Sequence, residues 1–596
     1  MGNRQGFDAS RRQVLQVAVL GIAAALAPRR VAAQALGAAA FRLGDAHAHL
    51  FNMSDLPVRG FIRHVGLPAG LERNGPVPAL LDLIDKLQPL AVTAAQELSD
   101  LERGIDPVPV HSTRLFNEAL RFIAEGKGRS SIGHPGFFRL VKLFGRPLEL
   151  ADSYGLLDAV LSRLKAAAER RDTNLEAVLG IKKPGDRDVI FGGDSKEMKS
   201  GFADRVLRLF RPGSPKCPEA PRGGGDGMSL AAIRAQLQWV HLMAQPRRCL
   251  LKRYLEVIQD GKVAPTTIVN LLVDYDRWLS DLPSPGSRHR DQIAFWTRLA
   301  RDKAGTVDIR TFAGFDPLKH AEERRDGGGS AYLDDLLGFY HDRWNAGSRF
   351  GIHGFKLYPP MGFAPSGNVA WMFEGDSPTV QTIRARWAGR FPDRRIHEEL
   401  NRALDEFFRA CSDEGIPVLA HAFHSNEAGH CFGSRASPLG WEPVLRRNPR
   451  LKICLGHFAD AKDFAAGLEM AEGADLPPHM WPLTGTSKLL DLNREREGRA
   501  YADISYMSEL LQLRKGRGRE RAVRFFLDLK TYCFRHDPQF RHILFGSDWL
   551  LLAREDRNQA YVSVIRQAMA EAGWEAEWID NLFFANLQRF VGPSGR

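Results

Sequence analysis

The chain has 596 residues, of which 44% are hydrophobic and 26% are charged. This predicts a globular protein with a sizeable core, built as two or more domains or as one large domain with an insertion. The net charge is +11, but the arginines are scattered and no basic helix interleaved with aromatic residues stands out. A solvated basic surface is therefore favoured over nucleic-acid binding, while anionic substrates and membrane lipids stay open as partners.

The first 35 residues have the order of a secretory signal. The pair Arg11-Arg12 precedes a short apolar run at 17–27 and a small-residue tail that ends at Ala35. The paired arginines resemble a twin-arginine signal, although the usual Phe and Lys of that motif are absent. We expect cleavage after Ala35, export through the twin-arginine translocation machinery and a periplasmic protein. The alternative is an uncleaved amphiphilic N-terminus.

After the expected signal, the chain has a mostly helical region and then a region in which strands and helices alternate. A first strand is expected at 41–49, and residues 51–262 form a mostly helical insertion, with helical apolar spacing at 78–101, 156–168 and 230–258. From residue 266 onward, short apolar runs alternate with helical patterns. The expected strands are 266–273, 308–315, 352–358, 417–423, 451–458, 500–505 and 542–549, and the expected helices include 291–301, 333–346, 396–414, 441–448, 519–533 and 558–572.

Eight strands separated by helices predict parallel pairing and an α/β fold, a (β/α)8 TIM barrel. The expected division is a signal peptide at 1–35, strand one at 36–50, the insertion at 51–262 and the rest of the barrel at 263–596. An open doubly wound sheet is the alternative, but no glycine-rich phosphate fingerprint follows the first strand.

The six cysteines contain no C-x-x-C pair. Cys454 lies in an apolar run and is expected to be a buried thiol. A disulfide would be compatible with an oxidising compartment, but no cysteine spacing argues for one.

The first strand carries the most informative pattern. Asp45, His47 and His49 alternate with small residues, so on a strand all three would point to one face. Two imidazoles on one face can bind a single divalent ion, and Asp45 could hold one of them in its metal-binding tautomer. Taken alone, the pattern is more often that of two surface histidines on an edge strand.

Further polar residues end the later strands, where barrel enzymes place their chemistry. Strands two, three and seven end in Asp274, Asp316 and Asp503, for which no role follows from the sequence. A lone barrel lysine is more often a salt-bridge partner than a metal ligand. A lone histidine at a strand end is as often a core residue as a metal ligand. The combination that predicts a metal site is Lys356 on strand four, His421 on strand five, His457 on strand six and Asp548 on strand eight.

Five motifs resemble the amidohydrolase superfamily of metal-dependent barrel hydrolases, and most closely its amidohydrolase-related branch, which also includes decarboxylases. They are D-A-H-A-H at 45–49, G-F-K at 354–356, P-V-L-A-H at 417–421, G-H at 456–457 and G-S-D at 546–548. The resemblance covers the barrel and leaves out the helical insertion. It implies a metal-dependent enzyme but does not specify a substrate.

The resemblance also implies roles for single residues. His47, His49 and Asp548 would bind a first metal ion. His421 would complete a one-metal site, with His457 holding or activating the water. In two-metal members a carbamylated lysine bridges the ions, and Lys356 stands at that position, with His421 and His457 on the second ion. Imidazole and carboxylate ligands favour zinc, with manganese or iron as alternatives.

Three functions follow as alternatives. The first is an exported hydrolase that acts on an amide, ester or lactone bond of a small molecule, with Asp548 carrying the proton of the attacking water. The second is a metal-dependent decarboxylase, and the third is a catalytically inactive binding barrel. The segment at 359–395 is expected to form a lid or pocket wall, and the insertion could cap the same face. Side chains that could contact a substrate are Tyr358, His424, Trp549 and Arg290.

Overall fold

The computed structural model describes residues 41–61, 88–110, 241–279, 286–327, 329–373, 377–387, 392–423, 427–429, 432–459, 484–511, 517–553, 555 and 557–592. The expected signal peptide, the expected helix at 156–168 and His424 lie outside these residues. The division of the chain into domains therefore stays a prediction.

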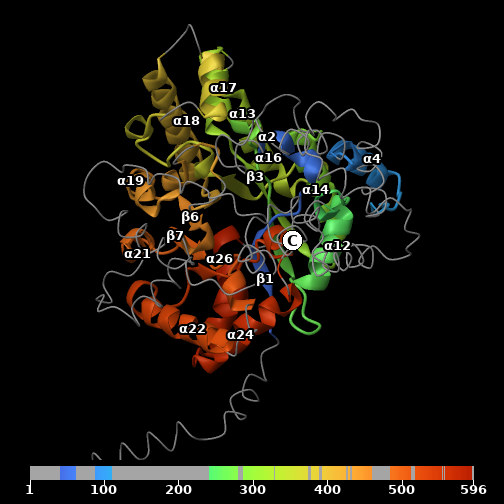
Figure 1. Ribbon diagram of the computed structural model, residues 1–596, viewed down its shortest axis with the longest axis vertical. Helices are drawn as coiled ribbons and strands as arrows, with labels where there is room; N and C mark the ends of the chain where they lie inside the picture. Colours follow the sequence, from blue (N-terminus) through green and yellow to red (C-terminus); the bar gives the residue numbers. More distant parts are fainter. Residues whose placement is uncertain are drawn as a thin grey trace, which may run out of the picture.

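Eight parallel strands form the centre of the molecule and pair in sequence order (Figure 1). The ring is closed by backbone hydrogen bonds from the Ala46 amide to the Phe545 carbonyl and from the Asp548 amide to the His47 carbonyl, 2.9 and 2.7 Å. The expected TIM barrel is confirmed. Its strands are β1 Gly44–Ala48, β2 Thr267–Leu271, β3 Asp308–Gly314, β4 Gly354–Leu357, β5 Pro417–Ala420, β6 Lys452–Leu455, β7 Ala500–Asp503 and β8 Ile543–Leu544.

Helices surround the barrel and confirm every helix expected after residue 266. α18 shows the reason: its apolar residues recur every three or four positions, it buries Leu400, Leu404 and Phe407, and Gly415 ends it in a left-handed conformation. Among the described residues, the α-helices after β2 are α13 Asp276–Leu279, α14 His289–Lys303, α15 Pro317–Arg325, α16 Ala331–His341, α17 Pro378–Trp387, α18 Asp393–Glu414, α19 Glu442–Arg447, α21 Thr484–Asp491, α22 Arg517–His536, α23 Trp549–Leu552, α24 Tyr561–Glu571, α25 Ala576–Asp580 and α26 Asn586–Val591.

Between β1 and β2 the described α-helices are α2 (Val58–Phe61), α4 (Ala94–Glu102) and α12 (Arg247–Val257). The expected continuous helices at 78–101 and 230–258 are wrong in their described parts, because each is broken at a proline. Pro89 lies in a 3-10 turn, and α4 starts anew after Thr93, whose side chain caps it; α12 starts directly after Pro246. Proline has no amide hydrogen for the helical hydrogen bonds, so the helix breaks there even though the helical spacing of apolar residues continues.

One end of the barrel interior is sealed by α26. Its Leu587 and Phe590 pack into the cluster of side chains that fills the barrel, which also contains Phe312, Leu419 and the thiol of Cys454, buried as expected. Leu587 lies against Gly44 at the start of β1. The opposite end, where the strands finish, is the end that carries the polar residues.

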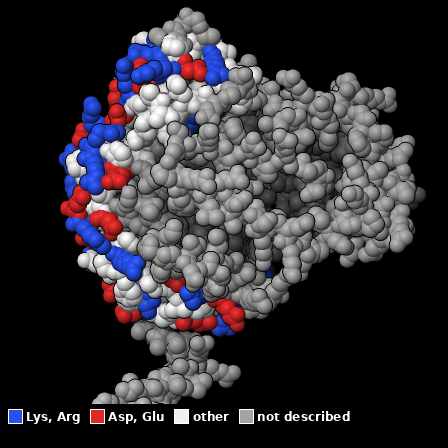
Figure 2. All heavy atoms as spheres, turned by 60° about the vertical axis from the view of Figure 1, so that its left-hand side comes forward, with Lys and Arg blue, Asp and Glu red and all other residues white. Residues whose placement is uncertain are grey.

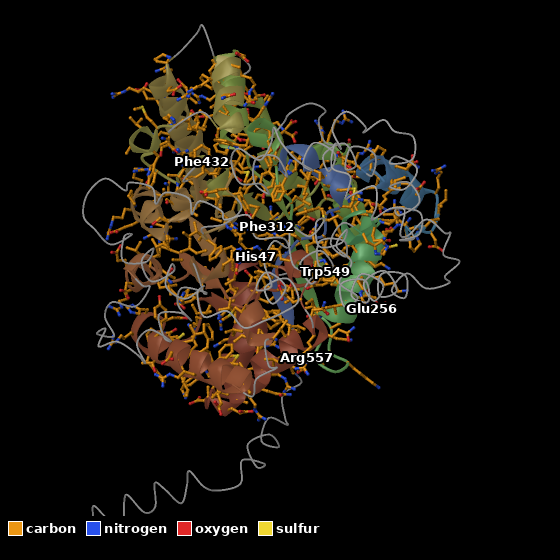
Figure 3. All side chains as sticks on the ribbon, in the orientation of Figure 1. His47, Glu256, Phe312, Phe432, Trp549 and Arg557 are labelled. Carbon is orange, nitrogen blue, oxygen red and sulfur yellow. The ribbon has the colours of Figure 1, made fainter. Side chains whose placement is uncertain are left out.

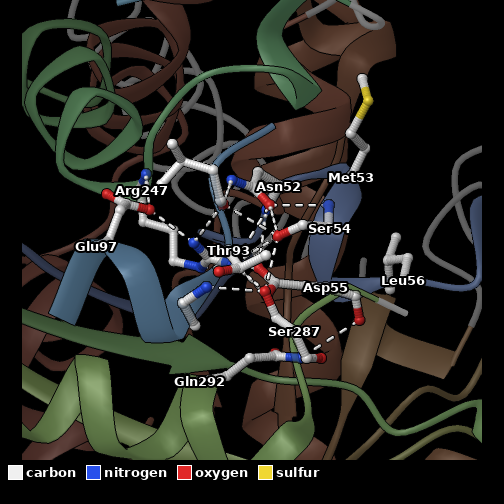
Figure 4. A network of polar contacts seen from close by, with 12 residues as sticks. Asn52, Met53, Ser54, Asp55, Leu56, Thr93, Glu97, Arg247, Ser287 and Gln292 are labelled. Atoms are coloured by element: carbon white, nitrogen blue, oxygen red, sulfur yellow. Dashed lines mark hydrogen bonds and ion pairs between the residues drawn. The ribbon is translucent and has the colours of Figure 1, made fainter. Parts of the chain in front are cut away.

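A buried arginine ties the chain after β1 to the barrel (Figure 4). The Arg247 side chain is fully buried and donates to the carboxylates of Asp55, at 2.9 Å from Nε, and Glu97, at 2.6 Å from Nη1. It also donates to the Ser287 hydroxyl, 2.9 Å away, directly before α14. The two carboxylates compensate the positive charge of the buried guanidinium.

Acidic and basic side chains are interspersed over the described part of the face in Figure 2. The exposed ion pairs of the protein include Arg447 with Asp405 and Arg450 with Asp413. None of the helices in the described ranges is both long enough and apolar enough to cross a membrane.

Candidate metal centre

The structure gathers the expected site residues at the carboxyl ends of the strands. His47 and His49 stand at the end of β1, and Asp548 follows β8. One ligand atom from each of these three buried side chains lies within 4.8 Å of the others. His49 Nε2 and Asp548 Oδ1 are 3.9 Å apart. Figure 3 shows His47 near the centre of the molecule.

Hydrogen bonds fix which nitrogen of each histidine faces this cluster. The Nδ1–H of His47 donates to Asp503 Oδ2 at 2.9 Å, and the Nδ1–H of His49 donates to the Leu271 carbonyl at 2.8 Å. Each acceptor assigns the proton to Nδ1 and therefore leaves the lone pair on Nε2. Both Nε2 atoms carry the lone pair that a metal ion requires.

Electrostatics keep these histidines neutral. Burial first, and then the nearby Lys356 ammonium, holds the pKa of His47 and of His49 well below the ordinary value. The bond between His47 and Asp503 is therefore made by a neutral imidazole to a carboxylate. A neutral imidazole is the form that coordinates metals.

Lys356 points inward, as expected, because its neighbours Phe355 and Leu357 pack in the outer core. Its Nζ lies 3.2 Å from His47 Nε2. Burial lowers the pKa of Lys356 to about 8, although the charges of Asp503 and Asp548 act in the opposite direction. A fraction of this amine is thus unprotonated near neutral pH.

His421 and His457 form a second pair beside the first. The Nδ1–H of His457 faces the Ser505 hydroxyl oxygen at 3.0 Å, so its Nε2 accepts from the Nδ1–H of His421 at 3.2 Å. The rings of His457 and His47 are 4.9 Å apart. His421 and His457 thus adjoin the cluster of His47, His49 and Asp548, although they are not among the three residues whose ligand atoms converge within 4.8 Å.

Asp503, at the end of β7, is the residue whose role the sequence did not reveal. Its Oδ2 holds His47, while its Oδ1 accepts from the backbone amides of His457 and Ser505, at 3.0 and 3.1 Å. The Ser505 hydroxyl donates to the same oxygen at 2.5 Å. One fully buried carboxylate therefore positions two of the expected site histidines. Its place at a strand end was the available signal.

The role expected for Asp45 is wrong. A register shift between Asp45 and Ala48 in the pairing of β1 with β2 breaks the alternation of side chains. Asp45 consequently accepts from the Tyr254 hydroxyl of α12 at 2.8 Å and from the Ser547 hydroxyl at 2.5 Å. It does not contact a histidine ring. Its hydrogen bonds instead hold the end of β8 against β1.

The glycines of the expected motifs make room for His47. A Cβ atom on Gly546 would stand 2.7 Å from the His47 Cβ, and one on Gly456 would stand 3.0 Å from the His47 ring. The nearby residues His457 and Asp548 bear the strain, with φ angles of 60° and 47°. Non-glycine residues in the left-handed region cost free energy and cluster at functional sites.

A small pocket adjoins this cluster at the ends of β2, β3 and β4. Met361 and Phe363 contribute to its wall, so the segment after β4 forms part of a pocket wall as expected. Arg435 holds this segment by donating to the carbonyls of Gly362 and of Trp371, the latter at 2.7 Å.

The expected substrate contacts have different positions. Tyr358 lines the pocket and stacks on His421 at 4.2 Å. Trp549 is fully buried and packs edge-on against Tyr254. Arg290 pairs on the surface with Asp335, and its guanidinium covers the rings of Phe339 and Phe350, so it does not join the site.

No family model matches the sequence, and no curated protein matches it. Among solved structures, a zinc-bound amidohydrolase from Burkholderia multivorans has 13% identity and a TM-score of 0.34, covering 59% of this chain and 91% of that one. The 2,6-dihydroxybenzoate decarboxylase from Rhizobium has 13% identity and a TM-score of 0.32, covering 59% and 91%. A manganese complex of 5-carboxyvanillate decarboxylase from Novosphingobium aromaticivorans has 13% identity and a TM-score of 0.30, covering 66% and 92%. With scores this low, the barrel assignment rests on the strand pairing of the chain itself.

Proposed function

We propose that the protein is a metal-dependent hydrolase that uses an activated water on an amide, ester or lactone bond of a small molecule. The observation that carries the proposal is the convergence of His47, His49 and Asp548 at the strand ends. Two neutral imidazoles with fixed tautomers and one carboxylate are a donor set that suits a divalent ion, zinc first and manganese or iron second. When bound, such an ion supplies Lewis-acid activation of water and of the substrate carbonyl.

The protein groups provide positioning and proton transfer. Asp548 takes the proton of the attacking water and returns it to the leaving group, because its carboxylate lies at the cluster and is buried. His457 orients the water through Nε2, where the water takes the place of the His421 Nδ1–H as donor. Asp503 fixes His47 and the backbone of His457 for both tasks.

The number of ions separates two versions of this site. In the one-ion version His421 is the further ligand. In the two-ion version Lys356 carries a carbamate, which requires the unprotonated amine that its lowered pKa provides. Metal analysis of the purified protein, giving one or two ions per chain, distinguishes the versions.

Metal analysis also tests the function itself. Protein from metal-replete expression should contain at least one divalent ion per chain. A content below about 0.2 ion per chain, with no gain of activity on adding metal, would refute a metal enzyme.

The Asp548→Asn variant tests the proton carrier. It should melt at a temperature close to that of the wild type but lose activity by about 100-fold or more, since general acid–base catalysis contributes 10²–10⁴-fold. The matched control is Asp335→Asn, which changes a carboxylate on the surface and should stay active. Full turnover by Asp548→Asn would show that another group carries the proton.

Decarboxylation is the second candidate. The apolar walls of the adjoining pocket favour it, because a carboxylate moved out of water loses its solvation. A screen of lactones, N-acyl amino acids and aromatic carboxylic acids, with carbon dioxide release measured in parallel, separates the two reactions.

Export is proposed from the order of residues 1–35 alone. Fractionation of cells that express the full chain should place it in the periplasm, shortened at its N-terminus. Replacing both Arg11 and Arg12 by Lys should retain it in the cytoplasm if the twin-arginine machinery carries it.

A further inference from the structure

The pocket beside the candidate metal centre has apolar walls and few polar groups. Trp278, Phe315, Met361 and Phe363 supply apolar surface. Most of its polar atoms are already paired within the protein. Asp274 accepts from Lys319 Nζ at 3.0 Å, and the Trp278 indole donates to Asp316 at 2.8 Å. The ion pair and the indole thus offer little to a ligand.

Tyr275 is different. It follows β2 and is 6% exposed, and within the described part of the chain its hydroxyl has no hydrogen-bond partner. Its ring packs edge-on against Tyr358 at 5.3 Å, and Tyr358 in turn stacks on His421. The hydroxyl is not among the buried, unpartnered polar atoms of the described residues, so it opens to the pocket that Tyr275 lines, where a hydrogen-bond partner can arrive from outside.

The surroundings indicate the chemistry of that partner. Lys356 lines the same pocket and lies 3.2 Å from His47, so the pocket joins the metal centre on its cationic side. Burial, followed by the neighbouring Tyr358 and Asp548, raises the pKa of Tyr275 well above its ordinary value. The phenol therefore keeps its proton and can donate a hydrogen bond, most favourably to an oxygen that bears negative charge.

We propose that Tyr275 is a substrate-binding catalytic residue, whose hydroxyl donates a hydrogen bond to the acyl oxygen of the substrate as that oxygen becomes negative. This rests on the proposed hydrolase function. When water adds to the acyl carbon, the electron pair of the carbonyl bond moves to oxygen, and Tyr275 stabilises the charge there. When the electron pair returns, the bond to the leaving nitrogen or oxygen breaks, and Asp548 gives that atom the proton of the water.

The kinetic test is the Tyr275→Phe variant on whichever acyl substrate the screen identifies. A donor that acts in the transition state predicts that kcat falls by about 100-fold while KM changes by less than about threefold. The matched control is Tyr340→Phe on α16, which also removes the hydroxyl of a largely buried tyrosine, far from the strand ends. This control should keep wild-type kinetics.

A binding test does not depend on turnover. Phenylphosphonate, a tetrahedral anion with an apolar ring, is titrated calorimetrically into the zinc-loaded wild type and both variants. The expected result is binding that weakens by about 10- to 100-fold in Tyr275→Phe and is unchanged in Tyr340→Phe. Thermal melting should show Tyr275→Phe at least as stable as the wild type, because the lost hydroxyl has no partner in the described part of the free protein.

Equal phosphonate binding by wild type and Tyr275→Phe would overturn the role of Tyr275, and so would a failure of the zinc-loaded wild type to bind the probe. Neither result would affect the metal content or the Asp548→Asn result, which decide the hydrolase proposal separately. A lower melting temperature for Tyr275→Phe, with kcat and phosphonate affinity unchanged, would show a packing role instead.

Discussion

Replacing Asp503 by Asn is a sharp test of how the barrel prepares His47 for a metal ion. Asp503 uses one oxygen for two backbone amides and the Ser505 hydroxyl, and the other for the Nδ1–H of His47. In the Asp503→Asn variant the amide NH2 must replace one of these oxygens. It will face His47, because the other position would oppose three donors, whereas this one opposes the His47 Nδ1–H and the weak thiol donor of Cys454, 3.8 Å away.

The consequence is a change of tautomer. An NH2 group opposite His47 requires an acceptor, so Nδ1 gives up its proton and Nε2 gains it. The Nε2 lone pair that points to the metal cluster is then lost. Changing such an outer partner of a ligating histidine costs about 10- to 100-fold in metal affinity, or about 1.4–2.8 kcal/mol.

The assay is zinc binding by the apoprotein in competition with a chromophoric chelator. Asp537→Asn is the matched control, because Asp537 is also buried and accepts from His542 Nδ1 at 2.8 Å, at a place that contributes nothing to the cluster. Both variants should lose stability, but only Asp503→Asn should lose affinity. Wild-type affinity in Asp503→Asn, or an equal loss in the control, would refute the tautomer argument.

Three further changes have defined outcomes. Gly546→Ala places a Cβ 2.7 Å from His47, so zinc affinity should fall and stability should drop by about 1–3 kcal/mol in urea titrations; unchanged values would mean that the strand end is free to shift. Arg247→Met leaves two buried carboxylates without their cation and should cost about 3–5 kcal/mol, measured as the free energy of unfolding; a cost below about 1 kcal/mol would contradict the structural role of the network. Burial lowers the pKa of His289 to about 4. Below pH 6.5 the unfolded chain therefore binds a proton at His289 that the folded chain does not bind, and the folded state loses stability. The wild type should therefore lose about 1.6 kcal/mol more than His289→Gln between pH 6.5 and 5, and parallel pH profiles would show that His289 is not held neutral.

The barrel and the types of residue at its open end could be predicted from the sequence. Strand periods, intervening helical spacing and turn residues are local, so they gave the eight strands in order. The polar residues from His47 to Asp548 could be recognised because each directly follows an apolar run. The breaks before α4 and α12 were also visible locally, as Pro89 and Pro246. They were missed because the helical apolar spacing continues across both prolines.

Which of these residues are in contact could not be predicted, because it depends on the tertiary fold. The register shift in β1 depends on hydrogen bonds to β2, more than two hundred residues away, and it turned Asp45 from the site toward Tyr254. Asp503 became the partner of His47 because β7 lies near β1 in the closed ring, a proximity with no trace in either strand's own sequence. The same closure explains Gly546, whose missing side chain matters because His47 and Ser505 occupy the space.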